Sequence, residues 1–415
     1  MRILFVSLSE KSHLYCMAPL AWALGAAGHE VRVASSPLLT ETVTRAGLTA
    51  VPVGHDHGIY QDMTSYRDSQ DYETANWSRT GPDEITWDEL RLRYELSVPY
   101  GFATYNDSMI DDLAAFAQSW KPDLVIRDPL AYAGAIAART CGAAHARLLW
   151  CTDVWGRSRR TYRELMAQVP EEQRSDPLTE WLTARAEPFG VTCDEELLNG
   201  QFTLDSLPPS LRLPSDLHEV SMRYVPYNGP AVVWDWLREA PKRPRVCLTL
   251  GSSNTEGYGG DYVSVPDILD ALSDLDVEVV AALVPAQRER IGAVPDNARA
   301  VDSVALNTLL PSCSAVIHHG GYGSYSTALA YGVPQLILST SISDHELRGR
   351  SLQDAGAGIF AHHREADAEQ VRGHVQRLVG ESGYGEAAER LRAEAAAMPS
   401  PQALVPVLER LATER

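Results

Sequence analysis

Short apolar runs alternate with amphipathic stretches along most of the chain. An apolar run at residues 3–8 is followed by a stretch at 17–24 with apolar positions at helical spacing, and then by a second apolar run at 31–34. This order predicts the strand–helix–strand unit of a parallel sheet. A third buried strand at 124–126, followed by an alanine-rich helix at 131–138, continues the same alternation.

The alternation starts again after a connector rich in proline, at residues 207–244. The apolar runs of this second half are Val246–Leu250, Val277–Leu283, Ala315–Ile317 and Gln335–Leu338. The sequence therefore predicts the α/β class, with two tandem Rossmann-like domains and a cleft between them.

The predicted boundaries follow from these patterns. Residues 1–220 form the first domain, 221–244 the linker and 245–400 the second domain, while a helix at 402–415 docks back on the first domain. Ligands of such sheets bind at the carboxyl ends of the strands, so the function is expected in the cleft.

The segment 59–100 interrupts the pattern, because it carries many tyrosine and tryptophan residues among charges and few aliphatic residues. We interpret it as an excursion outside the core.

Composition narrows the function. The 415 residues carry a net charge of -19 and the pI is near 5.0, so nucleic acid and an acidic membrane surface are unfavourable partners. No stretch reaches the ~20 apolar residues that span a bilayer. The amino terminus is expected to be a strand rather than a signal peptide. The six cysteines are scattered, which fits reduced thiols in a cytoplasmic protein.

The most informative motif lies between the strand at 315–317 and a helix-forming run at 327–330, and it reads His318-His319-Gly320-Gly321-Tyr322-Gly323-Ser324. Glycines without side chains let the backbone approach an anion, and the amides that open the helix favour phosphate. We predict a diphosphate site there, formed by His319, Gly320, Gly321, Gly323 and Ser324. Close packing of strand and helix is the alternative reading of the same glycines. Ser252 and Ser253, after the first strand of the second domain, are predicted to supplement the site.

Two residues of the first domain are candidates for acid–base chemistry. His13 follows the first strand and Asp128 follows the strand at 124–126, so both lie at the same edge of the sheet. His13 is the predicted general base, and Asp128 would orient its ring and stabilise the imidazolium. A polar helix start for His13 and a turn before Pro129 for Asp128 are the simpler alternatives.

Other chemistry has weaker support. The sequence lacks a serine nucleophile elbow near these residues, so hydrolase chemistry has weak support. The pairs His55/His57 and Asp274/Asp276 do not form a convincing metal site, so no metal is predicted.

Several segments together resemble glycosyltransferases of the two-Rossmann (GT-B) type, and within them the bacterial enzymes that attach aminodeoxysugars to macrolide or anthracycline aglycones, such as the desosaminyltransferases. The segments that carry the resemblance are Lys11–Leu14, Ala18–Leu24, Ala27–Val33, Pro122–Ile126, Met222–Gly229 and His318–Gly323.

The resemblance implies an inverting transfer from a dTDP-sugar donor to a polyketide hydroxyl without a metal. It assigns the base to His13 with Asp128, the donor diphosphate to His319, Gly321 and Ser324, and the nucleotide base to the backbone near Val304. It also implies a P450-like activator protein that docks on the first domain, to which the segment 59–100 is assigned. An acceptor lid that needs no partner is the alternative for that segment.

One departure from the pattern is informative. Many sugar-transferring relatives carry Asp-Gln where this chain has Asp344-His345, and in those relatives the Asp-Gln pair bonds hydroxyls of the sugar. Asp344 and His345 are therefore the predicted donor-sugar residues of this chain. A deoxysugar donor, which lacks some hydroxyls, would not need the amide.

Two other functions stay open from the sequence. A sugar-nucleotide 2-epimerase shares two Rossmann domains, and a non-catalytic module could bind a nucleotide sugar within a biosynthetic complex.

Overall fold

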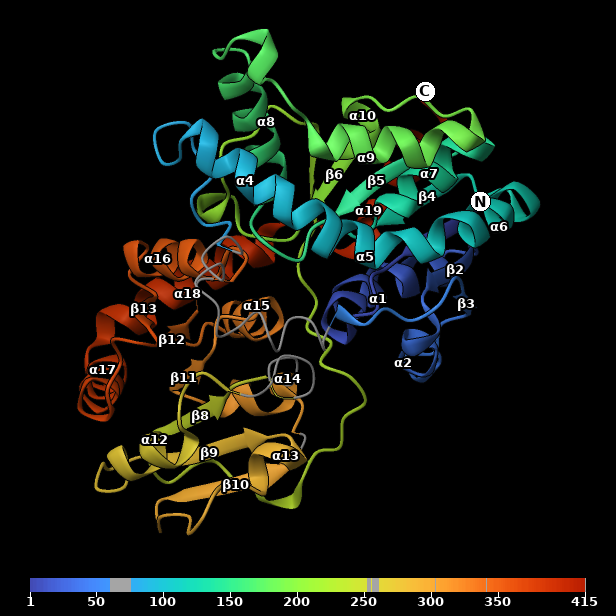
Figure 1. The fold of residues 1–415 in the computed structure, drawn as a ribbon. Helices are drawn as coiled ribbons and strands as arrows, with labels where there is room; N and C mark the ends of the chain where they lie inside the picture. Colours follow the sequence, from blue (N-terminus) through green and yellow to red (C-terminus); the bar gives the residue numbers. More distant parts are fainter. Residues whose placement is uncertain (60–75, 252–254, 256–260, 303, 341, 415) are drawn as a thin grey trace.

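The computed structural model describes residues 1–59, 76–251, 255, 261–302, 304–340 and 342–414. Two parallel sheets confirm the predicted α/β class with two Rossmann-like domains (Figure 1). The first sheet has seven strands in the order β3-β2-β1-β4-β5-β6-β7, and the second has six in the order β10-β9-β8-β11-β12-β13.

The strands of the first sheet are β1 (Arg2–Val6), β2 (Glu30–Ser35), β3 (Ala50–Pro52), β4 (Leu124–Arg127), β5 (Ala144–Leu148), β6 (Phe202–Asp205) and β7 (Glu219–Ser221). The helices of this domain are α1 (Lys11–Ala26), α2 (Thr40–Arg45), α4 (Trp87–Ser97), α5 (Ala103–Asn106), α6 (Ile110–Trp120), α7 (Tyr132–Cys141), α8 (Val154–Met166), α9 (Pro177–Ala186) and α10 (Glu195–Asn199).

The strands of the second sheet are β8 (Arg245–Thr249), β9 (Glu278–Leu283), β10 (Ala298–Asp302), β11 (Ala315–His318), β12 (Gln335–Ser339) and β13 (Gly358–His362). The remaining helices are α12 (Val265–Ala271), α13 (Pro285–Arg288), α14 (Leu306–Leu309), α15 (Tyr322–Tyr331), α16 (His345–Asp354), α17 (Ala368–Gly380), α18 (Ser382–Ala397) and α19 (Pro401–Thr413).

The central strands are buried on both faces, as expected for parallel sheets covered by helices. Every residue of β4, β5, β8, β11 and β12 is buried. One hydrophobic cluster crosses the domain boundary, because Met17 and Leu20 of α1 belong to the same cluster as Tyr325 of α15 and Leu408 of α19. The two domains therefore share apolar packing as well as the linker.

The last helix, α19, packs against α1 and β5, so the end of the chain lies on the first domain (Figure 1). It begins at Pro401, one residue before the predicted start, and the Ser400 hydroxyl accepts a hydrogen bond from the amide of Ala403. Helix-capping serine explains this start.

The interpretation of 59–100 as an excursion outside the core is wrong for the described part of that segment. Trp77, Leu90 and Tyr94 are buried. The ring of Trp77 packs against Trp155 with centroids 4.6 Å apart, and Tyr94 packs edge-on against Tyr162 at 4.7 Å. These large aromatic side chains fill space that aliphatic residues fill elsewhere, so a search for aliphatic runs missed them.

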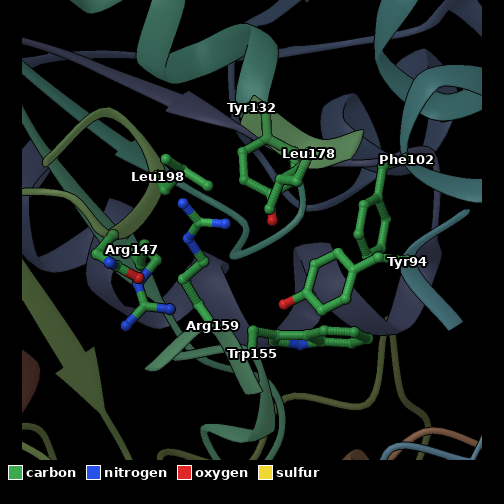
Figure 2. A pocket seen from close by; sticks show the side chains of 9 residues that line it. Tyr94, Phe102, Tyr132, Arg147, Trp155, Arg159, Leu178 and Leu198 are labelled. Carbon is green, nitrogen blue, oxygen red and sulfur yellow. The ribbon is translucent and has the colours of Figure 1, made fainter. Parts of the chain in front are cut away.

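A small cavity lies within this aromatic layer (Figure 2). The side chains around it include Tyr94, Phe102, Tyr132, Arg147, Trp155 and Arg159. Its volume of about 10 Å³ suits roughly one water molecule. The cavity is far too small for a polyketide, so it is not an acceptor site in this conformation.

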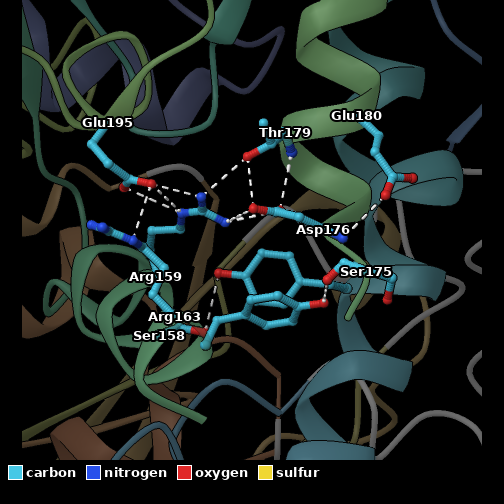
Figure 3. Close-up of polar contacts among 10 residues, drawn as sticks. Ser158, Arg159, Arg163, Ser175, Asp176, Thr179, Glu180 and Glu195 are labelled. Atoms are coloured by element: carbon cyan, nitrogen blue, oxygen red, sulfur yellow. Dashed lines mark hydrogen bonds and ion pairs between the residues drawn. The ribbon is translucent and has the colours of Figure 1, made fainter. Parts of the chain in front are cut away.

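A buried ionic cluster joins α8, α9 and α10 beside that cavity (Figure 3). Arg159 on α8 pairs with Asp176 at 2.8 Å and with Glu195 at 2.6 Å. Asp176 also accepts a hydrogen bond from the amide of Thr179 and caps α9. Burial alone would lower the pKa of Arg159, but the hydrogen bonds that Arg159 donates to Glu195 and the charge of Asp176 raise it above its usual value. Charge-assisted bonds of this kind fix the relative positions of the three helices.

We expect acid to destabilise the fold through His145. This β5 side chain is fully buried, and both of its ring nitrogens lack a partner among the described residues. Burial, with smaller effects of Arg127 and Arg139, lowers its pKa from 6.5 to about 3. The unfolded chain therefore takes up the proton first, and stability is lost as the pH falls below 6.5.

The variant His145→Leu removes this penalty. We compare the free energy of unfolding of the variant with that of the wild type. This difference should be about 2 kcal/mol more favourable to the variant at about pH 5 than at about pH 7.5. Urea unfolding at the two pH values measures the difference. The exposed His55→Leu is the control, and an equal effect of His145→Leu at both pH values would contradict the prediction.

Candidate active site

The candidate residues gather where each sheet reverses its strand order. In the first sheet the reversal lies between β1 and β4, and in the second it lies between β8 and β11. Crevices at the carboxyl ends of such strands are the usual ligand sites of doubly wound sheets. His13 follows β1 and Asp128 follows β4, while Gly251 follows β8 and His319 follows β11.

His13 and Asp128 form a hydrogen-bonded pair, as the sequence predicted. The His13 Nδ1 atom lies 2.7 Å from Asp128 Oδ2. The Asp128 side chain is fully buried, whereas 13% of the His13 side chain is exposed. The other Asp128 oxygen accepts a hydrogen bond from the amide of Leu130 at 2.9 Å. An ionised carboxylate only accepts hydrogen bonds, so Nδ1 carries the proton and Nε2 keeps its lone pair for a substrate.

A third residue, Trp150, completes this arrangement and was not found from the sequence. Its ring stacks on the His13 imidazole with centroids 3.9 Å apart and an angle of 18°. Trp150 follows β5 at the same edge of the sheet, and that position was a signal available in the sequence. The stack restricts rotation of the imidazole.

The glycine-rich turn in the second domain joins β11 to α15, again as predicted. His318 shapes the turn: its Nε2 lies 2.8 Å from Gln335 Oε1, and its Nδ1 accepts the amide of Gly320 at 3.0 Å. The amide N–H of Gly320 is therefore already bonded, and the call that Gly320 lines the diphosphate site stays a prediction. Gly320 serves the turn itself, with a φ of +92° that other residues rarely adopt.

His319 lies between two glycine loops. A Cβ at Gly251 would come 2.5 Å from the His319 ring, and a Cβ at Gly321 would come equally close. Burial and the positive charge of Arg348 lower the pKa of His319 to about 4, so the ring is neutral near pH 7. Its buried Nδ1 has no partner among the described residues.

The first turn of α15 follows directly. Gly321 is the N-cap of this helix, and Gly323 and Ser324 lie in its first turn. The first amides of a helix have no partner within it and carry partial positive charge, which suits an anion. The arrangement agrees with the predicted diphosphate site.

The other predicted donor residues have different positions. Val304 follows β10 at the same carboxyl edge and is buried, while Ser252 and Ser253 lie outside the described residues. His345 opens α16, and its ring meets the His319 ring edge-on with centroids 6.0 Å apart. Burial and the charge of Arg348 hold the pKa of His345 well below its usual value, so it is also neutral.

Asp344 lies at the contact between the two domains. Its side chain is fully buried. One carboxylate oxygen pairs with Arg348 at 2.9 Å, and the other accepts the amide of Thr152, in the first domain, at 2.8 Å. In this structure Asp344 bridges the two domains, and its contact with the donor sugar stays a prediction. The spacing Asp344/Arg348 on one helical face was a signal for this ion pair.

Further hydrogen bonds join the carboxyl edges of the two sheets. The amide of Trp77 donates to the carbonyl of Ser343 at 2.9 Å, and the amide of Leu347 donates to the hydroxyl of Ser78 at 3.1 Å. Helix α1, which carries His13, also contacts α15, which follows the His319 loop, so both candidate sites lie in one interdomain region.

Comparison with known proteins agrees with this geometry. Family models described as Erythromycin biosynthesis protein CIII-like match residues 22–251 with the N-terminal domain and residues 266–411 with the C-terminal domain. The chain belongs to the erythromycin biosynthesis protein CIII-like family.

Individual relatives are similar over nearly their whole length. The 10-deoxymethynolide desosaminyltransferase of Streptomyces venezuelae is 48% identical over 100% of this chain and 98% of its own. The 3-alpha-mycarosylerythronolide B desosaminyl transferase of Saccharopolyspora erythraea is 44% identical over 100% and 99%. The structure of the glycosyltransferase VinC in complex with dTDP matches with a TM-score of 0.89 and 40% identity, over 100% of both chains.

The predicted resemblance to GT-B antibiotic glycosyltransferases is confirmed, and so is the enzyme class. The CIII-like chain is a glycosyltransferase, and the 2-epimerase alternative is set aside. Among the residues that the structure describes, no group of three or more His, Cys, Asp or Glu side chains is placed to hold a metal ion. No helix in the described ranges is long and apolar enough to cross a bilayer.

The glycines of the α15 loop allow a matched pair of variants. In Gly321→Ala the new methyl group would overlap the His319 ring, so we expect weakened dTDP binding and a lower melting temperature. In Gly323→Ala the methyl group meets no protein atom within 4 Å, so the melting temperature should stay that of the wild type. Calorimetric titration with dTDP and thermal unfolding measure both effects. Equal melting temperatures of the two variants would contradict this account of the loop.

Proposed function

We propose that this chain is an inverting, metal-independent glycosyltransferase. In this proposal it moves a deoxysugar of the aminodeoxysugar class from a dTDP donor to a hydroxyl of a macrolide or other polyketide aglycone, in the cytoplasm. The observation that carries the proposal is the His13–Asp128 pair at the edge that faces the His319 loop. The names of the relatives support the substrate classes, and VinC supports dTDP as the nucleotide.

The acceptor hydroxyl would donate its proton to His13 Nε2 as its oxygen attacks the anomeric carbon. A new bond forms from this oxygen to the carbon on the face opposite the diphosphate. The bond from the carbon to the diphosphate oxygen breaks, and its electron pair leaves with the dTDP. Asp128 would stabilise the imidazolium that forms on His13, as expected of a buried carboxylate at Nδ1.

The diphosphate would be held by His319, Gly321, Gly323 and Ser324. The neutral imidazole of His319 supplies a hydrogen-bond donor, and the amino end of α15 supplies partial positive charge. Charge that develops on the leaving group is stabilised by such fixed donors without a metal. The backbone near Val304 would contact the thymine base.

The donor sugar would lie beside His345. The resemblance implies that His345 takes the place of a glutamine that bonds sugar hydroxyls. The partly buried, neutral ring of His345 offers fewer hydrogen bonds than an amide. A deoxysugar needs fewer bonds, which supports this donor class. The two desosaminyl relatives favour an amino sugar within it.

A P450-like activator that docks on the first domain is part of the proposal. The described part of the assigned segment exposes two large apolar side chains, Leu92 at 47% and Tyr100 at 73%. Exposed apolar groups of this size suit a protein interface. Loss of copurification in Leu92→Asp and Tyr100→Asp, with an unchanged melting temperature, would support this surface, and full copurification would reject it.

The proposed reaction is tested with dTDP-desosamine and 10-deoxymethynolide, with the products separated by mass spectrometry. We expect a glycosylated macrolide and free dTDP only when both substrates are present. Conversion of the donor alone into an isomer would contradict the proposal. Tight donor binding with no product, in the presence of a P450-like activator, would instead favour the non-catalytic binding module.

A further inference from the structure

One loop of the first domain connects the His13 base to the second domain. It runs from β5 to α8 over residues 149–153 and carries Trp150, whose ring stacks on His13. Two residues later, the amide of Thr152 donates to the Asp344 carboxylate of the second domain. The stacking partner of the base and the interdomain hydrogen bond therefore lie two residues apart.

The rest of this loop is fixed to the first domain. The amide of Leu149 donates to the carbonyl of Leu204 at 3.0 Å. Asp153 pairs with the buried Arg147 at 2.7 Å and accepts the amide of Gly156 at the start of α8. Residues 150–152 are thus a short span between two anchored ends, and the bond from Thr152 to Asp344 sets its position from the other side of the domain boundary.

Asp344 is itself held rigidly in the second domain. Its partner Arg348 is buried and lies over the rings of Tyr322 and Tyr325, at 5.4 and 5.3 Å from their centroids. Cation–π contacts of this kind keep the guanidinium in place. The carboxylate oxygen that remains faces Thr152.

The residue before Asp344 adds independent support. Ser343 has a φ of +53°, in the left-handed region that non-glycine residues rarely adopt. In this conformation its carbonyl accepts the amide of Trp77 from the first domain. Unfavourable backbone conformations persist where surrounding contacts demand them, and they are common at functional contacts.

We propose that Trp150 is a positioning residue for the His13 base, and that Asp344 holds the loop of Trp150 when the two domains are in contact. The inference rests on the proposed function, in which His13 is the base. In this inference, the role of Asp344 does not depend on contact with the donor sugar.

The stack and the Asp128 hydrogen bond constrain different rotations of the imidazole. The bond at Nδ1 allows the ring to tilt about that contact, whereas a ring face packed at 3.9 Å on an indole opposes tilting. When the Asp128 hydrogen bond and the Trp150 stack are both present, the Nε2 lone pair of His13 has a fixed orientation. The face of an indole also favours the cation that His13 becomes during transfer. A base set by a contact from the donor domain is correctly oriented only when that domain is in place.

The first test is structural and does not depend on turnover. It uses nuclear magnetic resonance of the full chain with isotope-labelled histidine, in which the His13 signal is assigned from its loss in His13→Ala. A proton of a ring stacked on an indole is displaced upfield. We expect this displacement to vanish in Trp150→Leu and to shrink in Asp344→Ala.

Two further variants guard this test against simple misfolding. The double variant Asp344→Leu with Arg348→Met removes the bridge without leaving a buried charge unpaired, and it should shrink the displacement as Asp344→Ala does. Trp181→Leu, at a partly buried tryptophan on α9 whose indole N–H bonds Asp107, is the matched control and should leave the His13 signal unchanged. An undisturbed His13 signal in the folded double variant would overturn the role of Asp344.

The second test separates positioning from a structural role by kinetics with dTDP-desosamine and 10-deoxymethynolide. Trp150→Leu should lower kcat on the order of 10²-fold, as for a misplaced catalytic group, with KM for the donor and dTDP affinity unchanged. Trp150→Phe, which restores an aromatic face, should recover most of kcat. Activity retained in His13→Ala would reject the base assignment, whereas an inactive His13→Ala beside a fully active Trp150→Leu would overturn only the positioning role.

Discussion

Replacement of His13 by alanine should lower the rate of sugar transfer by a factor on the order of 10²–10⁴, the usual contribution of a positioned general base. The acceptor hydroxyl then has to lose its proton to water while its oxygen attacks. The affinity for dTDP should stay at the wild-type value, because His13 belongs to the first domain and the diphosphate loop to the second. Single-turnover transfer rates and calorimetric titration with dTDP measure the two quantities.

Asp128→Asn is the companion variant. The amide is nearly the same size as the carboxylate, so the fold should persist. The neutral amide, however, no longer stabilises the imidazolium and can present an N–H to Nδ1. We expect a rate loss of a similar order to that of His13→Ala, on the order of 10²–10⁴. Because the two residues act as a unit, the double variant should be little slower than either single variant. If the rate loss of the double variant equals the product of the two single losses, the residues do not act as a coupled pair.

His374→Ala is the control for these changes, since this histidine lies on α17, outside the site. It should transfer sugar at the wild-type rate. A His13→Ala enzyme that also keeps the wild-type rate would remove the proposed base from the mechanism.

The second large effect is expected at His319. His319→Ala should weaken dTDP binding by about 10- to 100-fold, because a hydrogen bond to a charged group contributes about 1.5–3 kcal/mol. The low pKa of His319 makes the ring a neutral donor, so the loss is that of a hydrogen bond rather than of an ion pair. Calorimetric titration with dTDP, UDP and GDP measures it.

The nucleotide series also tests the donor class. The wild type should prefer dTDP, and the variant should lose affinity for all three nucleotides alike, because His319 is assigned to the diphosphate that they share. Unchanged dTDP affinity in His319→Ala would contradict the assigned diphosphate site. A preference for UDP or GDP in the wild type would contradict the donor class alone.

The sequence predicted the parts of the molecule that rest on local patterns. The apolar runs became the buried strands β1, β4, β8 and β11, because a strand covered on both faces has to be apolar throughout. The pairing of His13 with Asp128 followed from the ends of two adjacent strands. The turn from β11 to α15 followed from its glycines.

Contacts between distant segments were beyond the same reasoning. Nothing local distinguishes Gly320, whose amide His318 occupies, from Gly321, and nothing in the sequence near Asp344 indicates that Thr152 of the other domain is its partner. The segment around Trp77 and Tyr94 was misjudged because aromatic residues among charges read as surface. Tertiary packing decides these cases, and one sequence does not display it.

The central claim is a single displacement at the anomeric carbon. A base in the first domain takes the proton of the acceptor hydroxyl, and the second domain holds the diphosphate leaving group. The anomeric configuration of the product tests it most directly, and the coupling constants of the anomeric proton report it. With dTDP-desosamine and 10-deoxymethynolide, the account predicts a product of configuration opposite to that of the donor. A product with the configuration of the donor would contradict it, because a single displacement from the face opposite the diphosphate inverts the anomeric carbon.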